Sequence, residues 1–114
     1  MFVKVLVALE PCDLRKGFNG LEGLVSQRLG EEARSGTLYV FSNRRHNRLK
    51  ILYFDGTGLW ILTKRLEKGT FSWPRPSQVN AEQKLRLRPE AFALLTDGVD
   101  LRGARLRPWY ERDN

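Results

Sequence analysis

The side chains of this sequence that could do chemistry are mainly lysines and arginines in its central third. Residues 34–75 hold nine cations and only two carboxylates, Asp55 and Glu67, whereas the flanking segments are close to neutral. The net charge of +7 therefore arises in this one region. A concentrated positive field attracts polyanions, and nucleic acid is the commonest of these inside cells. A basic surface that serves only solubility is the less favoured interpretation, because the charge is clustered.

Seven of these cations are predicted to lie at one end of a β-sheet. The sequence predicts strands over 36–43, 48–54 and 58–66, the second of which alternates in its apolar residues, and the Asp-Gly pair at 55–56 predicts a hairpin turn. Because successive turns of a meander alternate between its ends, the turns near 44–48 and 67–70 should meet at the same end. Charge that only protects a sheet edge against aggregation is the alternative. The predicted DNA-binding residues are Arg44, Arg45, Arg48, Lys50, Lys64, Arg65 and Lys68.

Other kinds of chemistry find little support in the sequence. His46 and Cys12 are the single histidine and cysteine, and their separation matches no zinc-binding spacing. His46 is predicted in an exposed basic turn, with no serine or cysteine placed near it by sequence. No G-x-x-x-x-G-K-[ST] phosphate-binding loop is present. We therefore expect no catalytic residues, no metal and no cofactor, and the protein is predicted not to be an enzyme.

The elements that must position the cations form a single predicted domain over residues 1–114. An apolar strand over 2–9 precedes a helix over 14–29, which Asp13 should cap and Gly30 should end. Leu85 and Leu87 predict a short edge strand, and Pro89 starts a second helix that ends at Gly98. The predicted fold class is α+β: an antiparallel β-meander with the N-terminal helix packed on one face and a short C-terminal helix beside it. Residues 106–114 are expected to form a loosely ordered tail.

Two aromatic residues follow the last predicted turn, Phe71 and Trp73, next to Lys68 and Arg75. Aromatic side chains between cations can stack on unpaired bases. Packing against the core is the commoner use of such residues, and we favour it at least for Phe71.

Four blocks of the sequence resemble the Orf2 (TnpB) accessory proteins of the sixty-six family of bacterial insertion sequences, which are unrelated to the RNA-guided nuclease also called TnpB. The blocks are CDLRKGFNGLEGLV, GTLYVFSNRR, LKILYFDGTGLWILTKRLEKGTFSWP and LLTDGVDLRGARLRPWYE, and they extend from about Leu9 to Glu111. The resemblance implies a part in transposition, with the catalytic residues for strand transfer carried by a separate, larger protein. It supplies no residue-by-residue chemistry.

Two functions are compatible with this resemblance. The first is a non-catalytic accessory factor that binds DNA, at the element ends or as non-specific duplex, through the basic end of the sheet. The alternative is a protein adaptor that docks on the transposase without contacting DNA, and it would use Asp13, Arg15 and Lys16 in the DLRKGFNGL block. A lone cysteine and no apolar run approaching the ~20 residues of a membrane span predict a cytoplasmic protein.

Overall fold

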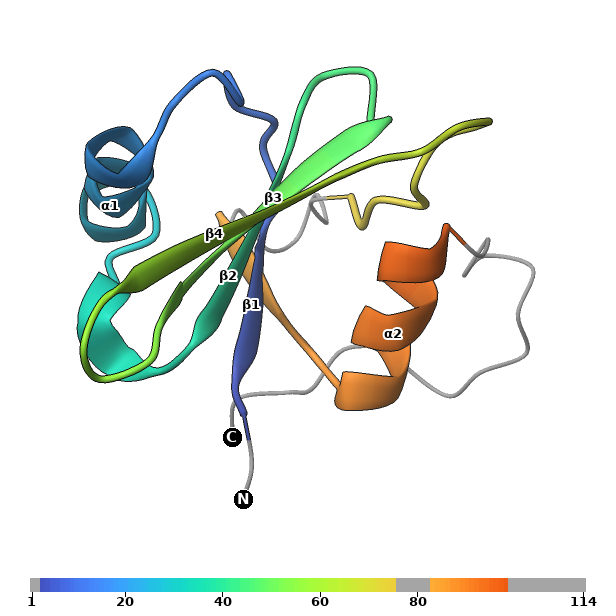
Figure 1. The fold of residues 1–114 in the computed structure, drawn as a ribbon. Coiled ribbons are helices and arrows are strands. Elements are labelled where there is room, and N and C mark those ends of the chain that lie inside the picture. Colours follow the sequence, from blue (N-terminus) through green and yellow to red (C-terminus); the bar gives the residue numbers. More distant parts are fainter. Residues whose placement is uncertain (1–2, 76–82, 99–114) are drawn as a thin grey trace.

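The computed structural model describes residues 3–75 and 83–98, and its strands form one five-stranded sheet with the order β4-β3-β2-β1-β5 (Figure 1). The strands are β1 (Val5–Ala8), β2 (Leu38–Ser42), β3 (Arg48–Phe54), β4 (Leu59–Arg65) and β5 (Lys84–Leu87). The helices are α1 (Phe18–Gln27) and α2 (Pro89–Asp97), with a short 3-10 turn, η1 (Ala33–Ser35), before β2. The predicted tail over 106–114 lies outside the described residues.

The antiparallel meander is confirmed for β2, β3 and β4 but is wrong for the sheet as a whole. β1 pairs with β2 in parallel and with β5 antiparallel, so the sheet is mixed. The chain between β1 and β2 passes through α1 and η1, and a helical crossover brings two strands together in parallel. All four residues of β1 are buried, because this strand lies inside the sheet.

The two faces of the sheet carry separate apolar clusters. α1 covers one face, where Leu21 and Val25 pack against residues such as Tyr39 and Leu52. α2 covers the other face, where Leu95 packs with Val40, Leu49 and further side chains of that cluster. The prediction that the C-terminal helix lies beside the N-terminal one is therefore wrong, since the helices lie on opposite sides of the sheet (Figure 1). Strand β1, apolar on both sides, needs both covers.

The first helix begins later than predicted. α1 starts at Phe18 with Gly17 at its N-cap, and no side chain among the described residues caps it. Asp13 instead accepts hydrogen bonds from the backbone N–H and the guanidinium of Arg15, so its carboxylate is not available to a helix start. Leu14 still packs against the α1 cluster, but from a turn rather than from a helix. Its apolar side chain at helical spacing made the helix look longer than it is.

The helix-ending glycines adopt the predicted backbone, although α1 ends at Gln27 with Arg28 at its C-cap, slightly earlier than the predicted end at 29. Gly30 has φ of +65° and Gly98 has φ of +81°, both in the left-handed region that glycine adopts without strain. Pro89 lies in the first turn of α2. β5 is an edge strand, as the alternation of Leu85 and Leu87 predicted.

The segment after the meander passes back into the core without forming a strand. Phe71 and Trp73 are both buried in the α2-side cluster, and the Trp73 indole N–H donates to the carbonyl of Ala8 at 2.9 Å. Core packing is thus confirmed for Phe71 and is found for Trp73 as well. Neither ring is available for stacking on a base.

Candidate nucleic-acid interface

The turns on either side of the β3–β4 hairpin meet at one end of the sheet, which carries most of the predicted cations. The N–H of Leu66 donates to the carbonyl of Asn47 at 3.0 Å, and the N–H of Phe71 donates to the carbonyl of His46. Arg48 lies directly across from Arg65 in the register of β3 and β4. Arg44, Arg45 and Lys68 are exposed in the connecting turns.

The alternation of the strands divides these cations between the two faces of the sheet. Arg48 and Lys50 are on the face of Leu52, which α1 covers, and Arg65 shares that face because it pairs with Arg48. Lys64 pairs with Leu49 on the α2 face, where its ammonium donates to the carbonyl of Thr96 at 2.7 Å. Lys64 therefore binds the C-terminal turn of α2 and does not join the others.

Arg48 and Arg65 form a cross-strand pair of like charge. Both side chains are exposed, and no carboxylate of the described residues lies within ion-pair distance of either. Like charges directly opposite each other on a sheet destabilise it, by roughly 0.2–1 kcal/mol. A bound anion placed between the two guanidinium groups would reverse the sign of this term.

Two further cations, Lys16 and Arg28, join Lys50 around Cys12 on the same face. Burial raises the pKa of the Cys12 thiol, and the positive charges of Arg28, Lys16 and Lys50 each act in the opposite direction. The ammonium of Lys50 donates to the carbonyl of Lys16 at 3.0 Å, which fixes the segment before α1 to the sheet. We call the combined surface the basic face, and its residues are Lys16, Arg28, Arg48, Lys50 and Arg65.

The turn that carries Arg44 and Arg45 is organised by a neutral side chain. Asn43 Oδ1 accepts the N–H groups of Asn47 (3.1 Å) and Arg48 (3.2 Å), and its amide nitrogen donates to Asn47 Oδ1. Because the turn satisfies its own polar groups, neither arginine is needed to hold it. Neither guanidinium forms an ion pair with a carboxylate of the described residues, so both can meet an external anion.

The adaptor residues of the second hypothesis are only partly placed together. Arg15 and Asp13 form a bidentate pair at 2.8–3.1 Å, and this pairing with Arg15 lowers the pKa of Asp13 to about 2. Their charges largely cancel. Lys16 is exposed and belongs to the basic face.

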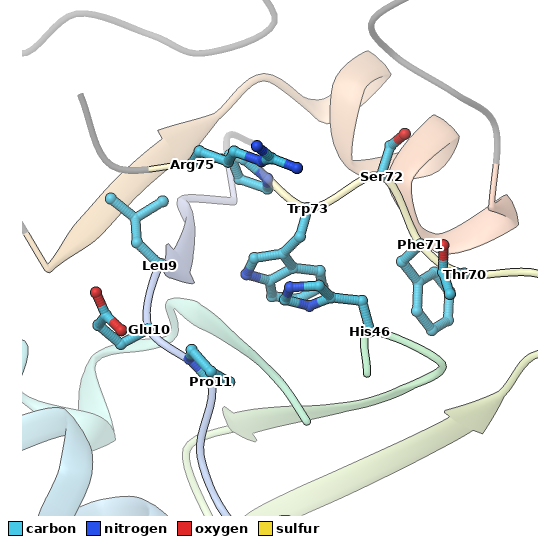
Figure 2. A pocket seen from close by; sticks show the side chains of 10 residues that line it. Leu9, Glu10, Pro11, His46, Thr70, Phe71, Ser72, Trp73 and Arg75 are labelled. Atoms are coloured by element: carbon cyan, nitrogen blue, oxygen red, sulfur yellow. The ribbon is translucent and has the colours of Figure 1, made fainter. Parts of the chain in front are cut away.

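His46 is not the exposed basic side chain that the sequence predicts. Its ring stacks on that of Trp73, with centroids 5.6 Å apart and planes 11° from parallel (Figure 2). Burial, followed by the charge of Arg75, lowers the pKa of His46, so the imidazole is neutral at pH 7. Its φ of +56° is in the left-handed region, which a non-glycine residue adopts only when its surroundings hold it there.

A serine also lies next to His46, contrary to the prediction. Ser42 Oγ is 2.8 Å from His46 Nδ1 and also donates to the carbonyl of Asn43. The Ser42 side chain is fully buried at the end of β2, so no substrate can reach its hydroxyl. The pair closes the turn and does not form an accessible nucleophile and base.

The depression beside His46 has a volume of about 510 Å³ and is lined by residues 9–11, His46 and residues 70–75 (Figure 2). Glu10 and Arg75 supply its charged groups, and they differ in sign. Within residues 3–75 and 83–98, no three His, Cys, Asp or Glu side chains come together in a way that could hold a metal ion. None of the helices in this part of the chain has the length and apolar composition to cross a membrane.

Sequence reasoning missed Arg28 and assigned Lys16 to a different surface. Both precede the basic segment by many positions. The hydrogen bond from Lys50 joins Lys16 to β3, and Arg28 is near this surface through Cys12, on which Arg28, Lys16 and Lys50 all act. The alternation of side chains along β3 could have revealed that Lys50 and Lys64 lie on opposite faces of the sheet. Lys64 pairs with Leu49, and the adjacent residues Leu49 and Lys50 point to opposite faces.

The comparisons with known proteins agree over nearly the whole chain. A family model described as "IS66 Orf2 like protein" matches residues 3–106. "Uncharacterized protein y4jC" of Sinorhizobium fredii (strain NBRC 101917 / NGR234) is 38% identical over 106 residues, covering 93% of this chain and 87% of that protein. "Uncharacterized protein y4hO" of the same organism is 35% identical over 101 residues, covering 88% and 84%. No solved structure has a significant match to this chain.

Proposed function

Because this chain belongs to the IS66 Orf2 like family, we propose that it is a non-catalytic accessory factor in transposition that binds DNA through its basic face. The family gives the transposition context, and the proteins of the same element are the partners that this context suggests. We infer the DNA contact from the charges of the basic face. We also propose that the protein is cytoplasmic, so that it meets the element's DNA directly.

The observation that carries the proposal is the uncompensated pair of Arg48 and Arg65. These arginines repel each other across β3 and β4, and Lys50 lies one step along the same face of the same strand. A phosphate between the two guanidinium groups would accept charge-assisted hydrogen bonds from both. A duplex lying along this face would also meet Lys16 and Arg28, and the turn cations Arg44, Arg45 and Lys68 would extend the contact. Lys64 is left out, because it is held by α2.

The proposal predicts a specific change in the salt dependence of DNA binding. In Arg48→Gln/Arg65→Gln, the slope of log K against log salt for a duplex should become shallower by about 0.9 for each phosphate that the variant no longer neutralises. The matched control is Arg15→Gln/Arg34→Gln, which removes the same charge from two guanidinium groups that already pair with Asp13 and Glu22. This control should leave the slope unchanged. Equal changes in both variants would show that only net charge matters and would reject the basic face as the interface.

A second candidate function, the adaptor that docks on the transposase, is supported by the Asp13–Arg15 pair. Both side chains of this pair are exposed, and neither caps a helix of the described residues, so the fold alone does not account for it. Co-purification of the transposase with this protein from nuclease-treated extract would favour the adaptor, and Asp13→Ala/Arg15→Ala should then weaken it. Loss of the transposase upon nuclease treatment would favour DNA bridging. Gel shifts with the element's terminal repeats and with random duplex, with and without transposase, would separate specific from non-specific binding.

A further inference from the structure

An apolar row of side chains crosses the sheet on the α2 face and continues beyond the part of the sheet that α2 covers. The paired residues are Val7, Val40, Ile51 and Leu62, taken across β1, β2, β3 and β4. Val7 and Val40 are fully buried and Ile51 is 9% exposed, but Leu62 is 54% exposed. α2 reaches β4 at its C-terminal end, where Thr96 binds Lys64. In Figure 1 the first half of β4 accordingly lies away from α2.

The neighbouring side chain on this bare surface is an exposed tryptophan held in a fixed position. Trp60 pairs with Tyr53 on the same face and is 58% exposed. Its indole N–H donates to Asp55 Oδ2 at 2.7 Å, and Asp55 is fixed in turn by the backbone N–H groups of Thr57 and Gly58. A large ring that is already immobilised loses little entropy on binding, which is the property of an interface anchor.

β4 also offers an unpaired backbone edge, since it is the last strand of the sheet within the described residues. Asp55 N–H donates to the carbonyl of Gly58 and Leu66 N–H donates to that of Asn47, which fixes the hydrogen-bonding phase of the β3–β4 hairpin. Hydrogen-bonded and non-hydrogen-bonded pairs alternate in an antiparallel ladder. The residues whose N–H and C=O groups point outward from the sheet are therefore Leu59, Ile61, Thr63 and Arg65.

We propose that the occupant of this edge is a second copy of the chain, paired β4 to β4 in antiparallel orientation with Leu62 opposite Leu62. In this register every outward-pointing backbone group of β4 finds a partner, because Ile61 faces Thr63 and Leu59 faces Arg65 of the other copy. Leu62 and Trp60 then occupy non-hydrogen-bonded positions, where opposing side chains lie closest. The result is one continuous sheet through both copies.

Charge selects the same arrangement. Lys64 of one copy comes to lie opposite Trp60 of the other and not opposite a second cation, while its ammonium keeps the hydrogen bond to Thr96. Sliding the strands so that Lys64 faces Lys64 or Arg65 faces Arg65 would place like charges directly opposite each other. The two-fold axis also directs the two cation-rich ends of β4 in opposite directions, so two chains of net charge +7 keep these ends apart. The proposed pairing uses the backbone edge of β4 and side chains on the α2 face, whereas the Arg65 side chain stays on the basic face. This inference therefore does not depend on the proposed DNA contact.

The oligomeric state tests the proposal directly. Sedimentation equilibrium from low micromolar to near-millimolar concentration should give a monomer–dimer equilibrium for the full chain. Leu62→Lys should raise the dimer dissociation constant by about a hundredfold, because two ammonium groups would face each other at the two-fold axis. Phe18→Lys is the matched control, since Phe18 is 48% exposed but lies on α1. It should leave the constant unchanged.

Disulfide trapping tests the register. In a Cys12→Ser background, Leu62→Cys should form a covalent dimer with diamide, because non-hydrogen-bonded partners lie within the Cα separation that a disulfide spans. Phe18→Cys in the same background should not. A chain that stays monomeric throughout the concentration range overturns the proposal, and a dimer that appears only after residues 99–114 are removed assigns the surface to that segment instead. A dimer that neither weakens with Leu62→Lys nor cross-links through position 62 also overturns it.

Discussion

The two turns that flank β3 are built in the same way but expose opposite chemistry. After β2, Asn43 Oδ1 accepts the backbone N–H groups of Asn47 and Arg48. After β3, Asp55 Oδ1 accepts those of Thr57 and Gly58, at 2.8 and 2.9 Å. In both turns one side chain replaces missing backbone partners, which is the usual role of Asn and Asp in turns.

Asn43 carries a neutral amide and Asp55 a charged carboxylate, and this difference determines which side chains each turn holds and which it leaves free. Asp55 is an anion that holds Trp60, and its turn carries no cation. Asn43 is neutral, so it organises its turn without pairing with Arg44 or Arg45. A carboxylate at position 43 would attract these side chains and cancel part of their field. We infer that the amide keeps the cations available to an external anion, whereas the carboxylate fixes an exposed ring.

The two turns also differ in their attachment to the core, and the largest expected effect follows from this difference. The Asn43 turn is fixed through His46, which stacks on the buried Trp73, whereas Trp60 of the other turn region is exposed. Trp73→Ala should lower the free energy of unfolding by about 3–5 kcal/mol. Trp60→Ala should lower it by about 1 kcal/mol or less. Urea unfolding followed by circular dichroism measures both, and similar decreases would contradict the comparison.

An exchange of the two turn residues should have an intermediate effect, this time on DNA binding. Asn43→Asp keeps an acceptor for the turn but adds a negative charge among the cations. One unit charge at about 4 Å in water contributes about 1 kcal/mol, so duplex affinity at low salt should fall about fivefold. The reciprocal variant, Asp55→Asn, also changes the charge by one unit, but at the opposite end of β3, and should leave the affinity nearly unchanged. An equal and opposite change in affinity would mean that net charge alone controls binding.

Much of the fold was predictable because its signals are local. The strands over 36–43, 48–54 and 58–66, the Asp-Gly turn, Gly30, Pro89 and Gly98 all act through neighbours in the sequence. The place of β1 was not predictable in this way. Its parallel pairing with β2 depends on where a long connection through α1 returns, and the buried pattern of four residues does not specify a neighbour.

In the candidate site, too, some features follow from local sequence and others from contacts between distant segments. That the turns near 44–48 and 67–70 share one end follows from hairpin topology and was predicted. The separation of Lys64 from Lys50 follows from the phase of the strands and the position of α2, which binds Lys64 through Thr96. His46 is partly buried and stacks on Trp73, which lies 27 positions further along the chain. Contacts between distant segments therefore changed the site more than they changed the elements.

The smallest expected effect is a difference in the pH range over which each turn loses its contribution to stability. Burial and Arg75 lower the pKa of His46 below its ordinary 6.5, and the hydrogen bond from Trp60, followed by that from the Thr57 N–H, lowers the pKa of Asp55 below 3.8. When folding lowers a pKa, the folded state binds fewer protons than the unfolded state at intermediate pH. The stabilisation is therefore complete above the unfolded pKa and is lost as the pH falls towards the folded one.

The free energy of unfolding, measured from pH 8 downwards, should thus decline in two stages. The first begins near pH 6.5 and belongs to the His46 turn, with a slope of at most about 1.4 kcal/mol per pH unit for one proton. His46→Asn should flatten this stage alone, since Asn tolerates the left-handed backbone and does not titrate. The second begins near pH 4, where Asp55→Asn should reduce the slope and leave a remainder that Asp13→Asn removes, because the pKa of Asp13 is also lowered. If His46→Asn left the upper stage intact, the neutral stack on Trp73 would not be what anchors the Asn43 turn, and the contrast between the two turns would rest on charge alone.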